Sequence, residues 1–374
     1  MRTLKITGTR TFPLDDGSLL LEMTTDAGIT GYGQPLSYGH RRLVMAAVEE
    51  LTGYLVGRDP FRIEDHWQVL YRTSYARAMP ILVGALSGLE MAMWDIAGKA
   101  LAEPVWRLLG GPVRDRVRVY AGCREPGQAR ELVDQGFTAL KMVTERKPWR
   151  FLEPPAGMEP TVRAVAAVRE EVGDGVDIAI DLHRRLSPAM SRVLLRELEP
   201  YRLLFAEEPC HWENVEALVG VARATPVPIA VGERQITRWG FREVVEREAA
   251  AVLQPDIRAC GGILEMRKIA ALAESHYLAL APHSGANGGP VGIAASLHVC
   301  AAIPNFLVME GGLQRGEGLF REPLRLVDGF LELPTGPGLG FEIDTDAVAA
   351  RTVDPEPLDR PMHRLAEDDS YADL

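Results

Sequence analysis

From about residue 117 to residue 310, the sequence repeats one pattern, in which a short apolar run is followed by a stretch with helical spacing. Apolar runs of this kind are typical of strands buried on both faces of a parallel sheet, and amphipathic helices cover such a sheet. The stretch at 160–172 opens with a proline and is followed by Gly173, which are signals for the start and the end of a helix. The eight apolar runs are RVRVYAG, FTALKM, VDIAID, LLFAEE, PIAVGE, AAVLQPD, YLALAPH and FLVME.

Eight alternating units are enough to close a barrel of the TIM type, so the predicted fold class is α/β with a barrel over residues 113–318. A doubly wound open sheet is the competing arrangement. It is disfavoured because no GxGxxG motif follows the first run, and because polar residues end nearly every run instead of gathering at one switch point.

Residues 1–112 lack this alternation and predict a separate α+β domain. The stretch SLLLEMTTDAGITGYG predicts two strands joined by a turn at Asp26 to Gly28. Helices are expected near residues 40–56, 62–72 and 80–101.

The alternation also stops after Glu310. The stretch LRLVDGFLELP at 324–334 predicts a hairpin that turns at Asp328-Gly329. We expect the C-terminal segment 319–374 to pack back on the first domain.

The composition narrows the class of protein. A chain of 374 residues with 47% hydrophobic and 25% charged residues is expected to be soluble and cytoplasmic, since no apolar stretch approaches the roughly 18 residues that cross a bilayer and no signal peptide is evident. The four cysteines stand in no CxxC spacing, which suits reduced thiols. The net charge of −11 argues against nucleic acid, and an anionic substrate would need local help such as a bound cation.

Polar residues that can carry chemistry stand near the ends of the apolar runs, and from Asp181 to Glu310 they follow one another at intervals of 23 to 27 residues. In a barrel the carboxyl ends of the strands surround one mouth, the usual location of the active site, so these residues would converge. In chain order they are Lys141, Asp181, Glu207, Glu233, Asp256, His283 and Glu310.

Three acids, Asp181, Glu207 and Glu233, end successive runs. In a low-dielectric mouth they would repel one another unless a cation neutralised them. Oxygen-only ligation that leaves positions for water and substrate suits octahedral Mg²⁺ better than zinc. The sequence therefore predicts a Mg²⁺ site, although any one of the three could instead be a surface acid that meets a helix N-terminus.

Two histidines are candidates for proton transfer. Asp256 and His283 end adjacent strands, so the carboxylate could orient the imidazole and raise its basicity, which describes a general base. In an extended chain His183 projects from the same face as Asp181, and it could then give a proton where His283 takes one. A frayed strand end in water is the alternative for this pair. With a metal-stabilised enediolate and protonation of a β-hydroxyl, loss of water would give a 2-keto-3-deoxy acid.

Motifs along nearly the whole chain resemble the enolase superfamily in its mandelate racemase-like branch, and within it the acid-sugar dehydratases that act on galactonate or mannonate. These motifs are VGRDPFRIEDHWQVLYR, LSGLEMAMWDIAGKALAEPVWRLLGGPVRDRV, DLHRRLSP, FAEEP, VGER, QPDIRACGGILEMRKIAALAE, LAPHS and VME. The resemblance implies a (β/α)₇β barrel with an α+β capping domain. It also implies that Asp181, Glu207 and Glu233 bind Mg²⁺ and that His283 with Asp256 forms the base dyad.

The same resemblance implies further roles. His183 matches the acid that expels the hydroxyl, and Glu310 matches an acid on the eighth strand that contacts the substrate. Lys141 matches a lysine on the second strand, which is either a substrate contact or a salt-bridged lysine. Racemases of this branch often carry KxK here, but Lys141 is followed by Met142-Val143, which disfavours racemisation by two bases.

Substrate choice is expected to depend on the segment at 34–42 and the loop at 144–160. Tyr38 and Arg41 are candidate substrate contacts, with ordinary packing roles as the alternative. The leading prediction is a Mg²⁺-dependent dehydratase of an aldonate such as galactonate, gluconate or mannonate, acting as a homo-oligomer of two to eight subunits with no membrane partner. The alternatives are a racemase or epimerase of a carboxylate substrate and a non-catalytic acid-sugar-binding homologue.

Overall fold

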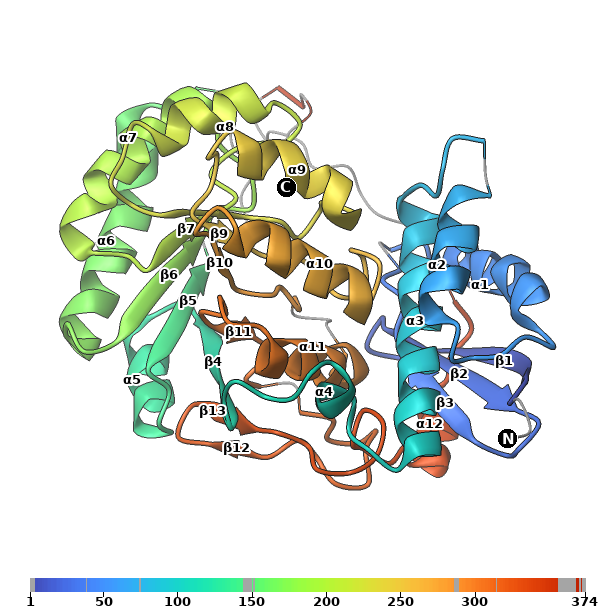
Figure 1. The fold of residues 1–374 in the computed structure, drawn as a ribbon. Helices are drawn as coiled ribbons and strands as arrows, with labels where there is room; N and C mark the ends of the chain where they lie inside the picture. The colour runs from blue at the N-terminus through green and yellow to red at the C-terminus, as the bar shows by residue number, and fades with distance from the viewer. Residues whose placement is uncertain are drawn as a thin grey trace.

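Two parts make up the fold, a β/α barrel and an α+β cap beside it (Figure 1). Helix α3 (Pro80–Leu101) lies between them and contacts both the cap strand β3 (Thr30–Gly33) and the barrel helix α10 (Ile263–Glu274). The computed structural model describes residues 4–37, 39–73, 75–143, 150, 152–285, 289–313, 315–355, 368–369 and 371.

In the described part of the chain, eight parallel strands form the barrel, and the first seven of them pair in chain order. The last strand pairs with the first, and a bridge between Leu280 and Phe306 joins it to the seventh, so that the barrel closes. The strands are β4 (Arg116–Cys123), β5 (Ala139–Val143), β6 (Asp177–Asp181), β7 (Phe205–Glu207), β8 (Ile229–Val231), β9 (Val252–Leu253), β10 (Ala279–Leu280) and β11 (Met309–Glu310).

A helix follows each of the first seven strands, which confirms the predicted (β/α)₇β arrangement within the described residues. The helix predicted at 160–172 begins earlier, at Pro155, so that Pro160 lies inside it. The barrel helices are α5 (Pro126–Asp134), α6 (Pro155–Val172), α7 (Pro188–Leu198) with a 3₁₀ turn η1 (Glu199–Tyr201), α8 (Val215–Ala222), α9 (Thr237–Glu246), α10 and α11 (Pro290–Ala302).

The barrel interior explains why chemistry gathers at the strand ends. Alternate residues of each strand point inward. Aromatic and small side chains fill the interior below the mouth, namely Tyr120, Ala139, Ala179, Phe205, Ala230, Val252, Ala281 and Val308. For six of these eight residues, the residue two positions further along the chain is polar, namely Lys141, Asp181, Glu207, Gln254, His283 and Glu310.

In the described residues, the cap has a three-stranded antiparallel sheet on which α1 (Arg41–Leu55) and α3 pack, and α2 (Ile63–Arg72) packs on α3. The predicted turn at Asp26 to Gly28 is present, and the positive φ of Gly28, 76°, suits a residue that lacks Cβ. The cap elements are β1 (Ile6–Pro13), β2 (Leu19–Thr25), β3, α1, α2 and α3, and the short helix α4 (Val105–Leu108) leads into the barrel.

Helix α3 corrects one sequence-based expectation. It is long and apolar enough to cross a membrane by length and composition, with a mean hydropathy of 1.3 in its most apolar window. Within the fold 83% of that window is buried, because α3 is the helix on which the cap and the barrel both pack. Its apolar sequence is therefore accounted for by core packing.

A buried carboxylate joins the cap to the barrel. Glu90 of α3 accepts hydrogen bonds from the backbone N–H groups of Ile263 (2.8 Å) and Leu264 (2.9 Å) at the start of α10. It also accepts one from Trp94 Nε1 (2.8 Å). The fit requires Gly262, which has a φ of 90°, since a Cβ there would lie 2.1 Å from Glu90 Oε2. The first N–H groups of a helix have no partner within the helix, and Glu90 supplies acceptors for two of them, so it fixes α10 to the cap.

The C-terminal segment contacts both parts. Strands β12 (Leu326–Val327) and β13 (Phe330–Glu332) form the predicted hairpin, and β13 pairs antiparallel with the first half of β4. The last described helix, α12 (Thr345–Arg351), reaches the cap, where Arg351 pairs with Asp15 at 2.9 Å. The tail therefore belongs to neither part alone, and the domain boundaries at residues 112 and 318 stay predictions.

Candidate active site

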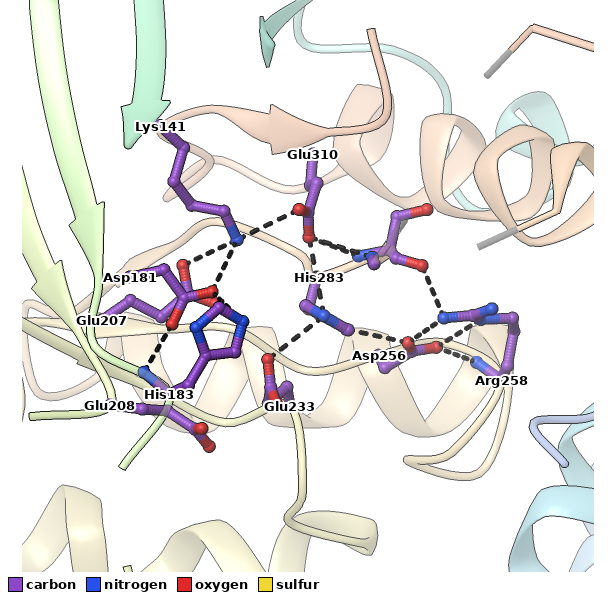
Figure 2. Close-up of polar contacts among 12 residues, drawn as sticks. Lys141, Asp181, His183, Glu207, Glu208, Glu233, Asp256, Arg258, His283 and Glu310 are labelled. Atoms are coloured by element: carbon purple, nitrogen blue, oxygen red, sulfur yellow. Dashed lines mark hydrogen bonds and ion pairs between the residues drawn. The ribbon is translucent and has the colours of Figure 1, made fainter. Parts of the chain in front are cut away.

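The three predicted metal ligands meet at the barrel mouth (Figure 2). Asp181 and Glu207 are the last residues of β6 and β7 and are opposite each other in the strand register. Glu233 follows β8, and one carboxylate oxygen from each of the three lies within 4.8 Å of the others. Glu207 Oε1 is buried without a hydrogen-bond partner among the described residues. A set of converging carboxylates with an unused oxygen fits a hard metal cation, so this cluster can hold a metal ion.

Lys141 places its ammonium group among these acids. Its Nζ lies 3.0 Å from Glu207 Oε2, 3.4 Å from Asp181 Oδ2 and 3.0 Å from Glu310 Oε1. Burial raises the pKa of Glu207 and the charge of Asp181 raises it further, whereas Lys141 lowers it. The site therefore concentrates negative charge that Lys141 only partly neutralises.

The predicted base dyad is assembled on the neighbouring strands. His283 Nδ1 lies 2.9 Å from Asp256 Oδ2, and Nε2 lies 3.1 Å from Glu233 Oε2. An ionised carboxylate only accepts, so Nδ1 donates to Asp256, while Nε2 faces Glu233 and the acid cluster. Burial lowers the pKa of His283, but the charge of Glu310 and the hydrogen bond to Asp256 outweigh it and raise the pKa. The ring is thus oriented to take a proton at Nε2.

Arg258 completes the dyad, although the sequence patterns did not single it out. Its Nε donates to Asp256 Oδ1 (2.9 Å), and its terminal nitrogen donates to Asp256 Oδ2 (2.5 Å) and to the carbonyl of Ser284 (2.6 Å). Burial works to raise the pKa of Asp256, but Arg258 and His283 hold it at about 2. The sequence did hold a signal for Arg258. Asp256 and Arg258 stand two positions apart at the end of an apolar run, as do Asp181 and His183, which were singled out as candidates.

His183 reaches the cluster by a route that corrects the prediction. Strand β6 ends at Asp181, and His183 and Arg184 have positive φ values of 49° and 54°, so strand alternation was the wrong reason. A turn instead brings His183 Nε2 within 3.2 Å of Asp181 Oδ2, and the His183 N–H donates to Asp181 Oδ1 (2.9 Å). Burial lowers the pKa of His183 to about 4 although Asp181 opposes it, so the imidazole is neutral near pH 7.

Glu310 at the end of β11 is an ionised acceptor. Its Oε2 accepts the backbone N–H groups of Ser284 and Gly285, each at 3.0 Å, and its Oε1 faces Lys141. Burial works to raise the pKa of Glu310, but Lys141, His283 and these two hydrogen bonds hold it well below its usual range. The side chain can accept a hydrogen bond from a substrate hydroxyl but has no proton to give.

A cavity of about 470 Å³ opens above these residues. Its floor includes Lys141, Asp181, His183, His283 and Glu310. The volume lies within the range usual for small-molecule sites and exceeds what a six-carbon acid needs. The candidate chemistry and the candidate binding space therefore coincide.

Of the two predicted specificity residues, only Arg41 is described by the structure. Arg41 is not among the described residues that line it, and its guanidinium donates to the carbonyl of Leu14 (2.9 Å) within the cap. Tyr38 lies outside the described residues, as do 144–149 and residue 151 of the predicted loop. From the described chain, Arg124 and Gln128 line the cavity instead, and no sequence pattern marked them.

Family models match both parts of the chain. Residues 14–110 match the mandelate racemase / muconate lactonizing enzyme N-terminal domain, and residues 126–347 match the enolase C-terminal domain-like family. With the barrel, the cap and the strand-end acids in place, the chain belongs to the enolase superfamily, with the domain pair of mandelate racemase and muconate lactonizing enzyme.

Named relatives narrow this class. The chain is 38% identical to a D-galactonate dehydratase of Cronobacter sakazakii over 97% of its own length and 98% of that protein's. It is similar to an enolase from Agrobacterium radiobacter described as a candidate galactarate dehydratase and solved with sodium and L-malate (TM-score 0.90, 32% identity, 98% and 99% of the two chains). It is also similar to a mandelate racemase/muconate lactonizing enzyme-like protein from Rubrobacter xylanophilus (TM-score 0.89, 34% identity, 95% and 99%).

Proposed function

We propose that this chain is a Mg²⁺-dependent acid-sugar dehydratase that converts an aldonate, such as D-galactonate, into a 2-keto-3-deoxy acid and water. One observation carries the proposal: His283 of the base dyad and a second histidine, His183, lie on different sides of the same three-carboxylate cluster. Similarity over nearly the full length to a D-galactonate dehydratase supports the reaction class.

The cation would be held by Asp181, Glu207 and Glu233. Their donor atoms are all carboxylate oxygens, which favours Mg²⁺ over softer metals. When bound, the cation supplies positive charge that stabilises the negative charge developing on the substrate carboxylate.

His283 would remove the proton from C2 of the substrate. Its Nε2 faces the cluster, and Asp256 accepts a hydrogen bond from Nδ1–H, so the ionised carboxylate stabilises the positive charge that the ring gains. Arg258 keeps Asp256 ionised and holds it in place. The electron pair of the C2–H bond moves into the substrate's C1–C2 unit.

His183 would protonate the C3 hydroxyl as the C3–O bond breaks, so that water leaves and the resulting enol becomes the 2-keto acid. With a pKa of about 4 in the protein's own field, its imidazole starts neutral. The negative charge that the substrate gains after losing its C2 proton would raise this pKa, so His183 would take up a proton from solvent at that stage and give it to the departing hydroxyl.

Lys141 and Glu310 would also contact the substrate. Lys141 offers N–H donors to a carboxylate, and Glu310, which stays ionised, offers an acceptor to a hydroxyl. Contacts by Tyr38 and Arg41, a cytoplasmic location and a homo-oligomeric assembly stay predictions.

The test is a screen of purified protein with Mg²⁺ against aldonates and aldarates, read out by keto-acid formation. A His283→Asn variant is the control. Keto acid formed by the unmodified protein and not by this variant supports the proposal. Deuterium from solvent appearing at C2 without keto acid would point to epimerisation instead, and no chemistry on any acid sugar would contradict a catalytic role.

A further inference from the structure

Unlike Arg234, Lys141 is almost fully buried where it meets the acid cluster. Its side chain is 4% exposed and lies over the Tyr120 ring, with Nζ 5.3 Å from the ring centroid. Arg234, the other cation on the acid cluster, contacts Glu233 and Glu208 and is 29% exposed. Water can therefore screen Arg234, whereas the charge of Lys141 acts at low dielectric.

The ammonium group of Lys141 lies within ion-pair distance of three protein acids. An ammonium group has three donors and no acceptor. The three acceptors, on Asp181, Glu207 and Glu310, lie 3.0 to 3.4 Å from Nζ (Figure 2). Two of the three, Asp181 and Glu207, belong to the carboxylate set that would hold the cation.

We propose that Lys141 is an internal counter-ion of the metal site, which holds Asp181 and Glu207 together before a cation binds and competes with that cation for their charge. Lys141 is then a positioning residue that sets metal affinity, in addition to any contact with substrate. This inference rests on the cation site of the proposed function.

Two opposite effects follow when the positive charge is removed. Without Lys141 the buried carboxylates repel one another, so the protein is less stable in the absence of metal. A divalent cation would then meet no competing charge and would bind more tightly. A lysine that only contacts substrate would produce neither effect.

The variants are Lys141→Met, which removes the charge at similar length, and Lys141→Arg, which keeps it. Lys99→Met is the matched control, because Lys99 pairs with the buried Asp95 at 2.7 Å on α3, away from the mouth. Calorimetry with MgCl₂ at pH 8.5, where protons compete least for the carboxylates, gives the affinity without substrate. Thermal unfolding in EDTA and in saturating Mg²⁺ gives the stability.

We expect Lys141→Met to bind Mg²⁺ at least tenfold more tightly than the unmodified protein, and Lys141→Arg to stay within threefold of it. In EDTA, Lys141→Met should melt at a lower temperature than the unmodified protein, and saturating Mg²⁺ should remove this difference. Any decrease in the melting temperature of Lys99→Met should be the same with and without Mg²⁺. If Lys141→Met is too unstable for calorimetry, its melting temperature across a Mg²⁺ titration gives the affinity.

Unchanged or weaker Mg²⁺ binding by Lys141→Met, or a stability deficit that Mg²⁺ leaves in place, would overturn the counter-ion role while leaving the dehydratase proposal intact. If the unmodified protein binds no Mg²⁺ at all, the proposed cation site fails and the counter-ion role fails with it. Keto-acid formation, measured separately, reports on the reaction alone.

Discussion

Two buried glutamates, one at the junction of cap and barrel and one at the barrel mouth, show what separates a structural acid from a candidate ligand. Glu90 is 1% exposed and Glu207 is 0% exposed, and burial raises the pKa of both. Both oxygens of Glu90 accept N–H groups from Ile263, Leu264 and Trp94.

Glu207 differs in how its oxygens are used. One faces Lys141, and the other has no partner among the described residues. Burial of a carboxylate is therefore not by itself a sign of function. The informative feature is a buried acceptor that the protein leaves unused, because such a group is costly unless a ligand supplies the missing interaction.

The largest expected effect lies at the mouth. His283→Asn should lower kcat for keto-acid formation by about 10² to 10⁴-fold, the usual contribution of a positioned proton-transfer group. The change keeps a polar side chain next to Asp256, so the melting temperature should move little. Turnover close to that of the unmodified protein would remove His283 from the chemistry.

Glu207→Gln sharpens the contrast between the two acids. It should weaken Mg²⁺ binding by at least about tenfold by calorimetry, because one of three ligand charges is lost. Its free energy of unfolding without metal should stay within about 1 kcal/mol of the unmodified protein, since the lost pairing with Lys141 is offset by less carboxylate repulsion. Glu90→Gln is the matched control and should bind Mg²⁺ normally. Equal Mg²⁺ affinities for the two variants would contradict the distinction drawn between them.

Arg258→Met tests the segment between β9 and α10, which connects the barrel mouth to the junction of cap and barrel. Arg258 holds Asp256 through two hydrogen bonds, and its carbonyl accepts the N–H of Leu36 from the cap. Loss of an orienting group of this kind usually costs about 10 to 100-fold. We expect that decrease in kcat with little change in KM, measured by keto-acid kinetics. A change in KM alone would assign Arg258 to substrate binding instead.

Glu90→Ala should show its effect in stability and not in catalysis. The substitution leaves the N–H groups of Ile263 and Leu264 without an acceptor in a buried region, which costs about 1–3 kcal/mol. Chemical denaturation would measure this loss. Mg²⁺ affinity should be unchanged at a temperature where the variant is folded, and a large loss of affinity would show that the junction controls the mouth.

A pH dependence of stability is also expected. Burial raises the pKa of Glu90 from 4.5 to about 8, so between these values the folded protein keeps a proton that the unfolded chain has lost. The contribution of Glu90 to stability is therefore complete below about pH 4.5 and is lost as the pH rises through about 8. In Glu90→Gln this part of the decline should vanish, as measured by unfolding at pH 5, 6.5 and 8. Parallel curves for the two proteins would mean that Glu90 stays ionised in the fold.

Much of this architecture could be predicted from the sequence because strand periodicity is a local property. The apolar runs placed the barrel strands, and their terminal residues placed Asp181, Glu207, Glu233, Asp256 and His283 at one mouth. Each of these side chains follows directly from where its own strand ends. No information about distant contacts was needed.

Contacts between distant segments could not be predicted in this way. The Glu90 carboxylate meets a helix that begins 173 residues later, and no local pattern encodes that meeting. The side chain of Arg258 folds back on Asp256, which depends on packing around it. His183 depends on a left-handed turn that non-glycine residues rarely adopt, so an extended chain was the natural expectation. Arg41 was a candidate contact because of its segment, but its backbone partner lies within the cap.

The first barrel strand also has a consequence for how the protein is made. Val119 and Tyr120 of β4 pair with β11, and Arg116 to Arg118 pair with β13, whose last residue, Glu332, follows Arg116 by 216 positions. A ribosome exposes β4 long before either of these partners exists. Contacts of such long sequence separation close late and slowly, and an unpaired strand edge is prone to misassembly. The nascent chain must therefore keep this edge of β4 unpaired until residues 309–332 have emerged, and a chain cut before residue 309 would leave the edge open.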